Sequence, residues 1–356
     1  MSSMRATSLI RRTAAGALLA VALLLGSTAP VLAGEPGHGH GPPLRGKLDM
    51  VGDIGDFVPG VIDDPVHDPT LFSDRGTYYV FSTGVLNPAD PGGIFARRST
   101  GTLAGPWESL GAIPLPEWTR AYGVNHLWAP HVVRNGPYFY LYYAASSFGT
   151  NHSAIGVART RTPGDLTSWV DLGPILTSDE SVNYNAIDPM VFRDHRNQWW
   201  ITFGSFWDGI KLQRLAGMTR PVGPVRSLAR HPDNPPDPIE NPQIFRHGRY
   251  YYLLVSWDFC CRGVQSTYRT AVGRSTSVTG PYLDRDGVPL AEGGGTVILS
   301  SRGNQIGPGA PDVLFDHGRW YMVHHYYDAN ADGVIRMQIR EIEWDRQGWP
   351  YFSPDA

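Results

Sequence analysis

The chain has 356 residues, a length that suits one large all-β domain better than a minimal one. Its 41 glycines, 30 prolines and 41 aromatic residues (11 Trp, 17 Tyr and 13 Phe) favour turns and strands, and a charged fraction of 18% excludes an architecture of long solvated helices. No basic run follows the first 33 residues, which argues against a nucleic-acid partner, because phosphate binding needs clustered positive charge.

Residues 1–33 have the pattern of a secretory signal peptide. Three arginines form a basic start, residues 13–26 form an apolar run too short for a permanent transmembrane helix, and residues 31–33 (VLA) fit a cleavage site. The alternative is an uncleaved anchor. We expect a secreted protein that does not act on a membrane. Because the segment carries three Arg and no acid, its removal would leave 27 basic and 33 acidic residues, a formal charge of −6.

Residues 34–49 (GEPGHGHGPPLRGKLD) are rich in Gly, Pro and His and predict a flexible N-terminal segment. A linker is the simplest interpretation, ahead of a weak metal binder or a surface tether. Residues 50–356 are then expected to form one folded domain.

A repeat dominates this domain. Each copy has a proline, a short apolar run, a polar turn, an aromatic pair and a second apolar run, which predicts a β-hairpin. The prolines that open the copies lie 53 to 69 residues apart. The copies are PTLFSDRGTYYVFST (69–83), PHVVRNGPYFYLYYA (130–144), PMVFRDHRNQWWITFGS (189–205), PQIFRHGRYYYLLVS (242–256) and PDVLFDHGRWYMVHH (311–325).

The stretch after the hairpin also recurs, as residues 92–107, 153–169 and 269–282 illustrate, and it predicts a third and a fourth strand. Four strands per unit of this size is the pattern of a propeller blade. The sequence therefore predicts an all-β, five-bladed β-propeller. A long β-sandwich is the alternative architecture, but it would not produce five self-similar units.

Acidic residues precede the opening proline in three of the five copies. They are Asp68, Asp188 and Glu240. In a propeller the first strand of each blade lines the central channel, so these positions converge at one mouth. Carboxylates that are buried together acquire different pKa values, which is the condition for a general acid and a general base to coexist. Glycoside hydrolysis needs such a pair. The alternative is that each residue only forms a turn.

Aromatic rings near the same mouth are candidates for stacking on sugars. Trp128 stands where other blades carry acids, and Phe148 follows the second strand of its blade. The two cysteines, Cys260 and Cys261, are adjacent, so they either form a vicinal disulfide or remain as two buried thiols.

The chain resembles glycoside hydrolase family 43, and within it the endo-1,5-α-L-arabinanases, over roughly residues 62–345. The resemblance rests on the stretches VHDP (66–69), NHLWAPHV (125–132), SAIGVA (153–158), NAIDPMVF (185–192), FGSFWDGIKL (203–212), SWDFCCRGVQSTY (256–268) and VGRSTSVTGPY (272–282). The stretches GSFWDGIKL and DFCCRG carry the endo-arabinanase resemblance, whereas Asp-Pro motifs are shared with other propeller glycosidases.

The resemblance implies an inverting hydrolase of arabinan. It implies that Asp68 is the base that activates water, that Glu240 is the acid that protonates the leaving oxygen, and that Asp188 tunes this acid and orients substrate. It also implies sugar contacts from Trp128, Phe148, Asn185 and Ser205. Finally, it implies a calcium ion in the channel, held mainly by waters and by one histidine at the position of His325.

The chain departs from the family pattern beside these residues. Asn241 stands where the family has alanine, His131 follows Pro130 where an aspartate is expected, and Ala310 replaces a histidine. All three carboxylates are kept.

Two other functions compete with an endo-arabinanase. One is an exo-acting arabinofuranosidase or β-xylosidase of the same family, which needs a blocked subsite. The other is a sugar-binding propeller without catalysis, which predicts the loss of at least one acid. We expect arabinan and its oligosaccharides as the partners of a monomeric enzyme.

Overall fold

The computed structural model describes residues 50–52, 66–84, 93–124 and 126–353, with the backbone only for residues 50–52, and all of them belong to the unit Gly46–Ala356. The predicted signal peptide (1–33) and the predicted N-terminal segment (34–49) lie outside the described residues. Within the described part of the chain, no helix is long and apolar enough to cross a membrane.

Five four-stranded antiparallel sheets make up this unit. Blade 1 contains β2 (Thr70–Asp74), β3 (Thr77–Thr83), β4 (Ile94–Thr100) and β5 (Glu108–Ile113). Blade 2 contains β6 (Trp128–Asn135), β7 (Tyr138–Ala145), β8 (Ser153–Thr160) and β9 (Val170–Ser178). Blade 3 contains β10 (Met190–Arg193), β11 (Trp199–Phe203), β12 (Ile210–Ala216) and β13 (Arg220–Ala229). Blade 4 contains β14 (Ile239–His247), β15 (Tyr250–Trp257), β16 (Arg269–Ser275) and β17 (Thr296–Leu299). Blade 5 contains β18 (Gln305–Asp316), β19 (Arg319–Asp328), β20 (Val334–Glu341) and β1 (Met50–Gly52).

The remaining elements are short. A two-stranded sheet is formed by β21 (Glu343–Trp344) and β22 (Pro350–Tyr351). The 3₁₀ turns are η1 (Glu117–Tyr122), η2 (Leu166–Ser168), η3 (Gly263–Gln265), η4 (Leu290–Glu292) and η5 (Ala329–Ala331).

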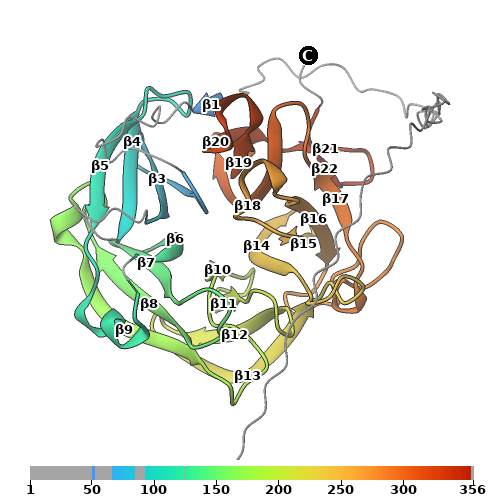
Figure 1. Ribbon diagram of the computed structural model, residues 1–356, viewed down its shortest axis with the longest axis horizontal. Coiled ribbons are helices and arrows are strands. Elements are labelled where there is room, and N and C mark those ends of the chain that lie inside the picture. Colours follow the sequence, from blue (N-terminus) through green and yellow to red (C-terminus); the bar gives the residue numbers. More distant parts are fainter. Residues whose placement is uncertain (1–49, 53–65, 85–92, 125, 354–356) are drawn as a thin grey trace, which may run out of the picture. The chain divides into compact units, whose positions relative to one another are not determined.

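The predicted five-bladed propeller is confirmed. All five repeat copies form the first hairpin of a blade, and the blades surround a common centre with β6, β10, β14 and β18 towards the inside (Figure 1). The strands that follow each hairpin complete the sheets, as the recurring stretches predict.

Apolar side chains hold neighbouring blades together in five clusters, one between each pair of blades. Successive residues of a strand point to opposite faces of the sheet, so one strand supplies two clusters. In β3, Tyr79 and Phe81 pack towards blade 2, whereas Tyr78 and Val80 pack towards blade 5. The aromatic pairs of the repeat are thus explained by burial on both faces.

Three contacts close the ring between the last blade and the first. The strand β1 pairs with β20 and completes blade 5 from the N-terminal side. One of the five clusters joins blade 5 to blade 1. At the centre, Asp312 accepts hydrogen bonds from the hydroxyl of Thr70 (2.7 Å) and the backbone N–H of Leu71 (2.8 Å). Closure protects the sheet edges that an open arrangement would expose.

The residue before each opening proline has a left-handed backbone. The five φ angles are +49° at Asp68, +42° at Ala129, +55° at Asp188, +53° at Asn241 and +50° at Ala310. A residue with a β-carbon seldom adopts this conformation, and proline restricts the residue before it further. The repeat therefore contains a fivefold backbone turn that directs these residues to one mouth of the channel. Such outliers gather at functional sites.

Candidate active site

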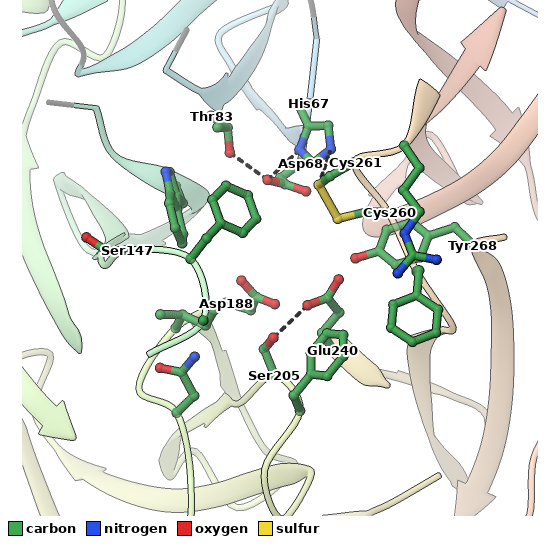
Figure 2. A pocket seen from close by; sticks show the side chains of 18 of the residues that line it. His67, Asp68, Thr83, Ser147, Asp188, Ser205, Glu240, Cys260, Cys261 and Tyr268 are labelled. Carbon is green, nitrogen blue, oxygen red and sulfur yellow. Dashed lines mark hydrogen bonds and ion pairs between the residues drawn. A yellow bond between two sulfur atoms is a disulfide. The ribbon is translucent and has the colours of Figure 1, made fainter. Parts of the chain in front are cut away.

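A cavity of about 1140 Å³ lies at this mouth, and residues from all five blades line it. Figure 2 shows that Asp68, Asp188 and Glu240 point into the same space, with Asp68 opposite the other two. The predicted convergence of the three carboxylates is confirmed by their geometry. Their chemical roles remain to be argued from their surroundings.

Asp68 lies at the end of the segment that leads into β2, and its side chain is 13% exposed. Its Oδ2 accepts a hydrogen bond from the hydroxyl of Thr83 (2.6 Å) and pairs with Nδ1 of His67 (2.8 Å). Burial by itself would raise the pKa of Asp68, but His67, His325 and the Thr83 hydroxyl together lower it to about 2. Asp68 is therefore ionised at neutral pH and suited to accept a proton.

The pKa of Glu240 is shifted in the opposite direction from that of Asp68. Glu240 is buried in β14, and the hydroxyl of Ser205 donates to its Oε2 over 2.6 Å. Burial, reinforced by the charge of Asp68, raises the pKa of Glu240 to about 7 even though the Ser205 hydrogen bond opposes the shift. Glu240 therefore keeps a proton under conditions where Asp68 has lost its own.

The position of Glu240 differs by one residue from that of the two aspartates. Asp68 and Asp188 are the left-handed residues before proline, whereas in blade 4 this place belongs to Asn241. Glu240 stands one residue earlier, at the repeat position of His67, and its longer side chain enters the cavity from there. The three carboxylates therefore occupy two neighbouring positions of the repeat. Asp68 and Asp188 directly precede the proline, and Glu240 stands one residue before that.

Asp188 is hydrogen-bonded to the backbone of the residue that follows Glu240. Its Oδ2 accepts a hydrogen bond from the backbone N–H of Asn241 (3.1 Å), the residue that follows Glu240. Burial, and next the charges of Glu240 and Asp68, raise the pKa of Asp188 well above its ordinary value. Asp188 therefore both holds the backbone beside Glu240 and repels its ionised form.

Aromatic rings stand on two sides of the acids. On the blade 2 side, the rings of Trp128 and Phe148 lie 5.0 Å apart, and Phe148 is 78% exposed. On the blade 4 side, the guanidinium of Arg262 covers the ring of Phe259 at 4.1 Å. The exposed ring of Phe148 is a suitable surface for the apolar face of a sugar.

Asn185 and Ser205 also line the cavity, as expected, but both already have partners. The side-chain oxygen of Asn185 accepts from the hydroxyl of Ser153 (2.7 Å), which leaves its amide nitrogen with only a long contact of 3.5 Å to Thr150. Ser205 is engaged with Glu240. The geometry thus gives Ser205 a place beside the candidate acid that the sequence pattern did not indicate.

His325 is completely buried in β19, on the channel side, while its neighbour His324 is also buried. Its Nδ1 accepts from the backbone N–H of Asp68 (3.2 Å) and lies 3.8 Å from Oδ1 of Asp68. Its Nε2 has no hydrogen-bond partner within the described ranges. His67, Asp68 and His325 each offer a ligand atom within 4.8 Å of one another.

This surrounding fits a cation that has a single protein ligand. With Nδ1 accepting, the hydrogen of the neutral ring lies on Nε2; a metal at Nε2 would require that hydrogen on Nδ1, where Oδ1 of Asp68, 3.8 Å away, is the nearby carboxylate oxygen. Oδ2 of Asp68 is occupied by Thr83 and His67, so waters would have to supply most of the oxygen shell that calcium prefers.

The two cysteines form a vicinal disulfide that lines the cavity (Figure 2). This decides between the two alternatives that the sequence left open. The loop that carries it lies between β15 and β16, and Cys261 has a left-handed backbone with φ +65°.

Several residues of the site were not singled out from the sequence. His67 and Thr83 hold Asp68, and Tyr327 contacts His67. His67 stands inside the VHDP motif, so its position was visible but its role was not. Thr83 and Tyr327 reach the site from the ends of second strands, where the sequence pattern carries no special signal.

A propeller that gathers an ionised and a protonated carboxylate in one cavity, between exposed rings, has the catalytic equipment of a glycoside hydrolase. Comparison with known proteins agrees. The family model for glycosyl hydrolases family 43 matches residues 60–350, and the chain belongs to this family.

Two relatives illustrate the range of similar proteins. The chain is 39% identical over 300 residues to the extracellular endo-α-(1→5)-L-arabinanase 1 of Bacillus subtilis, with 82% of this chain and 89% of that protein covered. It is 36% identical over 303 residues to the extracellular exo-α-(1→5)-L-arabinofuranosidase of Cellvibrio japonicus, with 80% and 85% covered.

Solved structures share the fold at similar identity. The endo-arabinanase of Bacillus licheniformis superposes with a TM-score of 0.76 at 38% identity, covering 85% of this chain and 99% of that one. The α-L-arabinanase of Cellvibrio cellulosa in complex with arabinohexaose gives a TM-score of 0.73 at 35% identity, covering 81% and 95%.

Proposed function

We propose that the protein is a secreted hydrolase that cleaves internal α-1,5-L-arabinofuranosidic bonds of arabinan with inversion of the anomeric centre. The observation that carries this proposal is the pair formed by Asp68 and Glu240, whose pKa values lie near 2 and near 7 within one cavity. The relatives that act on arabinan support the choice of substrate.

In this mechanism Asp68 removes a proton from a water molecule as its oxygen attacks the anomeric carbon. Glu240 donates its proton to the glycosidic oxygen as the bond to that carbon breaks. The cycle ends with a proton on Asp68 and a charge on Glu240, and exchange with solvent restores both groups. The low pKa of Asp68 means that the base is ready across the whole neutral range.

Asp188 acts on Glu240 in two ways in this scheme. Its hydrogen bond from the N–H of Asn241 fixes the backbone next to the acid. The two carboxyl groups disfavour simultaneous ionisation, so a proton is retained between them. The proton that the leaving oxygen needs is held by Glu240, whose pKa is raised to about 7 by burial and by the charge of Asp68.

Sugar rings would lie against Trp128 and Phe148 on one side of the acids, and Asn185 would contribute polar contacts from blade 3. The opposite wall carries Phe259 and Arg262. Rings on both sides of the acids favour an internal chain segment over a chain end. This is why we propose endo cleavage, although two similar proteins are named as exo enzymes.

We further propose that His325 binds a calcium ion through Nε2, which requires the ring hydrogen to move to Nδ1, beside Oδ1 of Asp68, and the hydrogen bond from the Asp68 N–H to be given up. The ion would supply a positive field beside the carboxylates. We also propose that residues 1–33 are a signal peptide, in line with the extracellular relatives, and that the enzyme is a monomer.

A product time course tests the proposed function. The purified protein is incubated with linear α-1,5-arabinan, and the products are separated by chromatography while viscosity is followed. Mixed oligosaccharides with an early fall in viscosity are expected. Arabinose as the sole early product would contradict endo cleavage, and the absence of any product would contradict the proposed hydrolysis.

A further inference from the structure

The loop between β15 and β16 carries the disulfide and is held by its own backbone. The N–H of Thr267 donates to the carbonyl of Phe259 (2.9 Å), and the N–H of Arg262 donates to the hydroxyl of Ser266 (3.0 Å). In the folded loop Cys261 contacts Tyr327 of blade 5 and His67, which leads into blade 1. The disulfide between adjacent residues closes a small ring through the peptide bond of Cys261 and restricts its orientation.

A continuous chain of contacts leads from this loop to the candidate base. The backbone N–H of Cys261 donates to the hydroxyl oxygen of Tyr327 (2.7 Å). That hydroxyl lies 3.1 Å from Nε2 of His67, and Nδ1 of His67 lies 2.8 Å from Oδ2 of Asp68. The chain joins blade 4, blade 5 and blade 1.

The hydrogen bonds in this chain have a defined direction. An ionised Asp68 only accepts, so Nδ1 of His67 must carry a hydrogen. Burial opposes the protonated ring, but Asp68 raises the pKa of His67, so the ring is neutral only above that raised pKa, and there Nε2 is an acceptor. The oxygen of Tyr327 is occupied by the N–H of Cys261, which leaves its own hydrogen for Nε2. Tyr327 thus selects the tautomer of His67 that donates to Asp68.

Packing around the ring of His67 also holds its orientation towards Asp68. Its ring is stacked on that of His325, with centroids 3.9 Å apart and an angle of 24° between the planes. The sulfur of Cys261 lies 3.8 Å from Nε2. Tyr327 is 1% exposed, so water does not compete for its hydroxyl. The ring is therefore confined, and its Nδ1 remains directed at Asp68.

We propose that Tyr327 and the disulfide-bonded Cys261 are positioning residues for the hydrolytic reaction, which act on the base Asp68 through His67. This inference rests on the proposed function, because it assigns Asp68 the role of base. It gives the vicinal disulfide a role that the family resemblance does not assign: it fixes the N–H that orients Tyr327.

The central test replaces Tyr327 by phenylalanine, which removes the hydroxyl and keeps the ring. A matched control is Tyr142→Phe, because Tyr142 is also buried and its hydroxyl donates one hydrogen bond, to the carbonyl of Met218 (2.7 Å), outside the cavity. Tyr142→Phe removes one buried hydrogen bond and Tyr327→Phe removes two, at about 1 kcal/mol of stability for each bond, so the melting temperature of both variants is measured alongside kcat.

We expect Tyr327→Phe to lower kcat on arabinan about tenfold with KM unchanged, a part of the roughly 10²–10⁴-fold that a positioned base contributes. Tyr142→Phe should leave both constants unchanged. A kcat equal to that of the parent in a folded Tyr327→Phe variant would overturn the proposal. Equal losses in kcat for both variants would show that the effect is structural, which also overturns it.

A second measurement does not depend on activity. Long-range ¹H–¹⁵N spectra report which ring nitrogen of a histidine carries the hydrogen, and His67→Gln identifies the signals of His67. At one fixed pH above the raised pKa of His67 we expect Tyr327→Phe, and the double variant Cys260→Ser/Cys261→Ser, to replace the single tautomer of His67 by a mixture. An unchanged spectrum in both variants would contradict the inference. If the spectra change as expected while the parent protein hydrolyses no arabinan, the proposed function fails and the contact chain stands.

Discussion

Ser205 and Glu240 are joined twice: the hydroxyl of Ser205 donates to Oε2 of Glu240 over 2.6 Å, and the two residues form an isolated antiparallel bridge. The bridge connects the loop between β11 and β12 of blade 3 to β14, the first strand of blade 4. It fixes the candidate acid relative to Asp188, which lies in the same blade as Ser205. The same hydrogen bond also favours the ionised form of Glu240, so it limits how far burial raises its pKa.

Removal of this hydrogen bond should shift the pH dependence of the reaction. Activity requires protonated Glu240 and falls as the pH rises through about 7, the pKa of Glu240. In Ser205→Ala the carboxylate loses a donor, so the pKa of Glu240 rises and the falling limb of kcat/KM moves to higher pH. Ser181→Ala is the control, because Ser181 donates to Asp179 on the surface. A limb that moves to lower pH would contradict the assignment of the acid.

Loss of the acid itself should be far more severe. Glu240→Gln keeps the shape of the side chain but has no proton to donate to the leaving oxygen. We expect kcat to fall by about 10²–10⁴-fold while arabino-oligosaccharide binding, measured by calorimetry, persists. Glu117→Gln, an exposed change beside Arg120, should be neutral. Undiminished turnover by Glu240→Gln would remove Glu240 from the acid role.

The exposed ring of Phe148 should contribute to binding and not to stability. It is 78% exposed, so Phe148→Ala is expected to leave the melting temperature unchanged. Loss of stacking should raise KM for arabino-oligosaccharides by about 2- to 12-fold, corresponding to about 0.5–1.5 kcal/mol. Phe315→Ala removes another exposed ring, outside the cavity, and should change neither quantity. Equal KM values for the parent protein, Phe148→Ala and Phe315→Ala would exclude a contact between Phe148 and the sugar.

Calcium should stabilise the folded protein if His325 binds it. After treatment with a chelator, addition of calcium is expected to raise the melting temperature, because a ligand that binds only the folded state stabilises it. In His325→Gln this response should be lost. A melting temperature that does not depend on calcium in the parent protein would refute the proposed ion.

Much of the fold could be predicted because each blade repeats the same local chemistry. Paired aromatics such as Tyr78 and Tyr79 face opposite clusters, and their alternation is visible in the sequence. The order of the blades then follows from chain order. The strand β1 was not predicted, because a three-residue strand without an aromatic pair carries no repeat signal and gains its partner, β20, only when the ring closes.

The carboxylates were predictable for the same reason, since the repeat aligns them. The residues that hold Asp68 and His67 in place were less visible. Thr83 and Tyr327 reach the cavity from different blades, and their roles depend on the left-handed turn before each proline and on the path of the Cys260–Cys261 loop. Such contacts arise from closure of the propeller and leave little trace in local sequence.

The most direct test of the central claim is the anomeric configuration of the first product. Arabinan hydrolysis is followed by ¹H NMR at high enzyme concentration, so that the new reducing end is observed before it equilibrates. A water activated by Asp68, opposite the acid Glu240, predicts that the β-anomer is formed first from the α-linkage. Initial formation of the α-anomer would mean retention through a covalent intermediate and would contradict the roles assigned to Asp68 and Glu240.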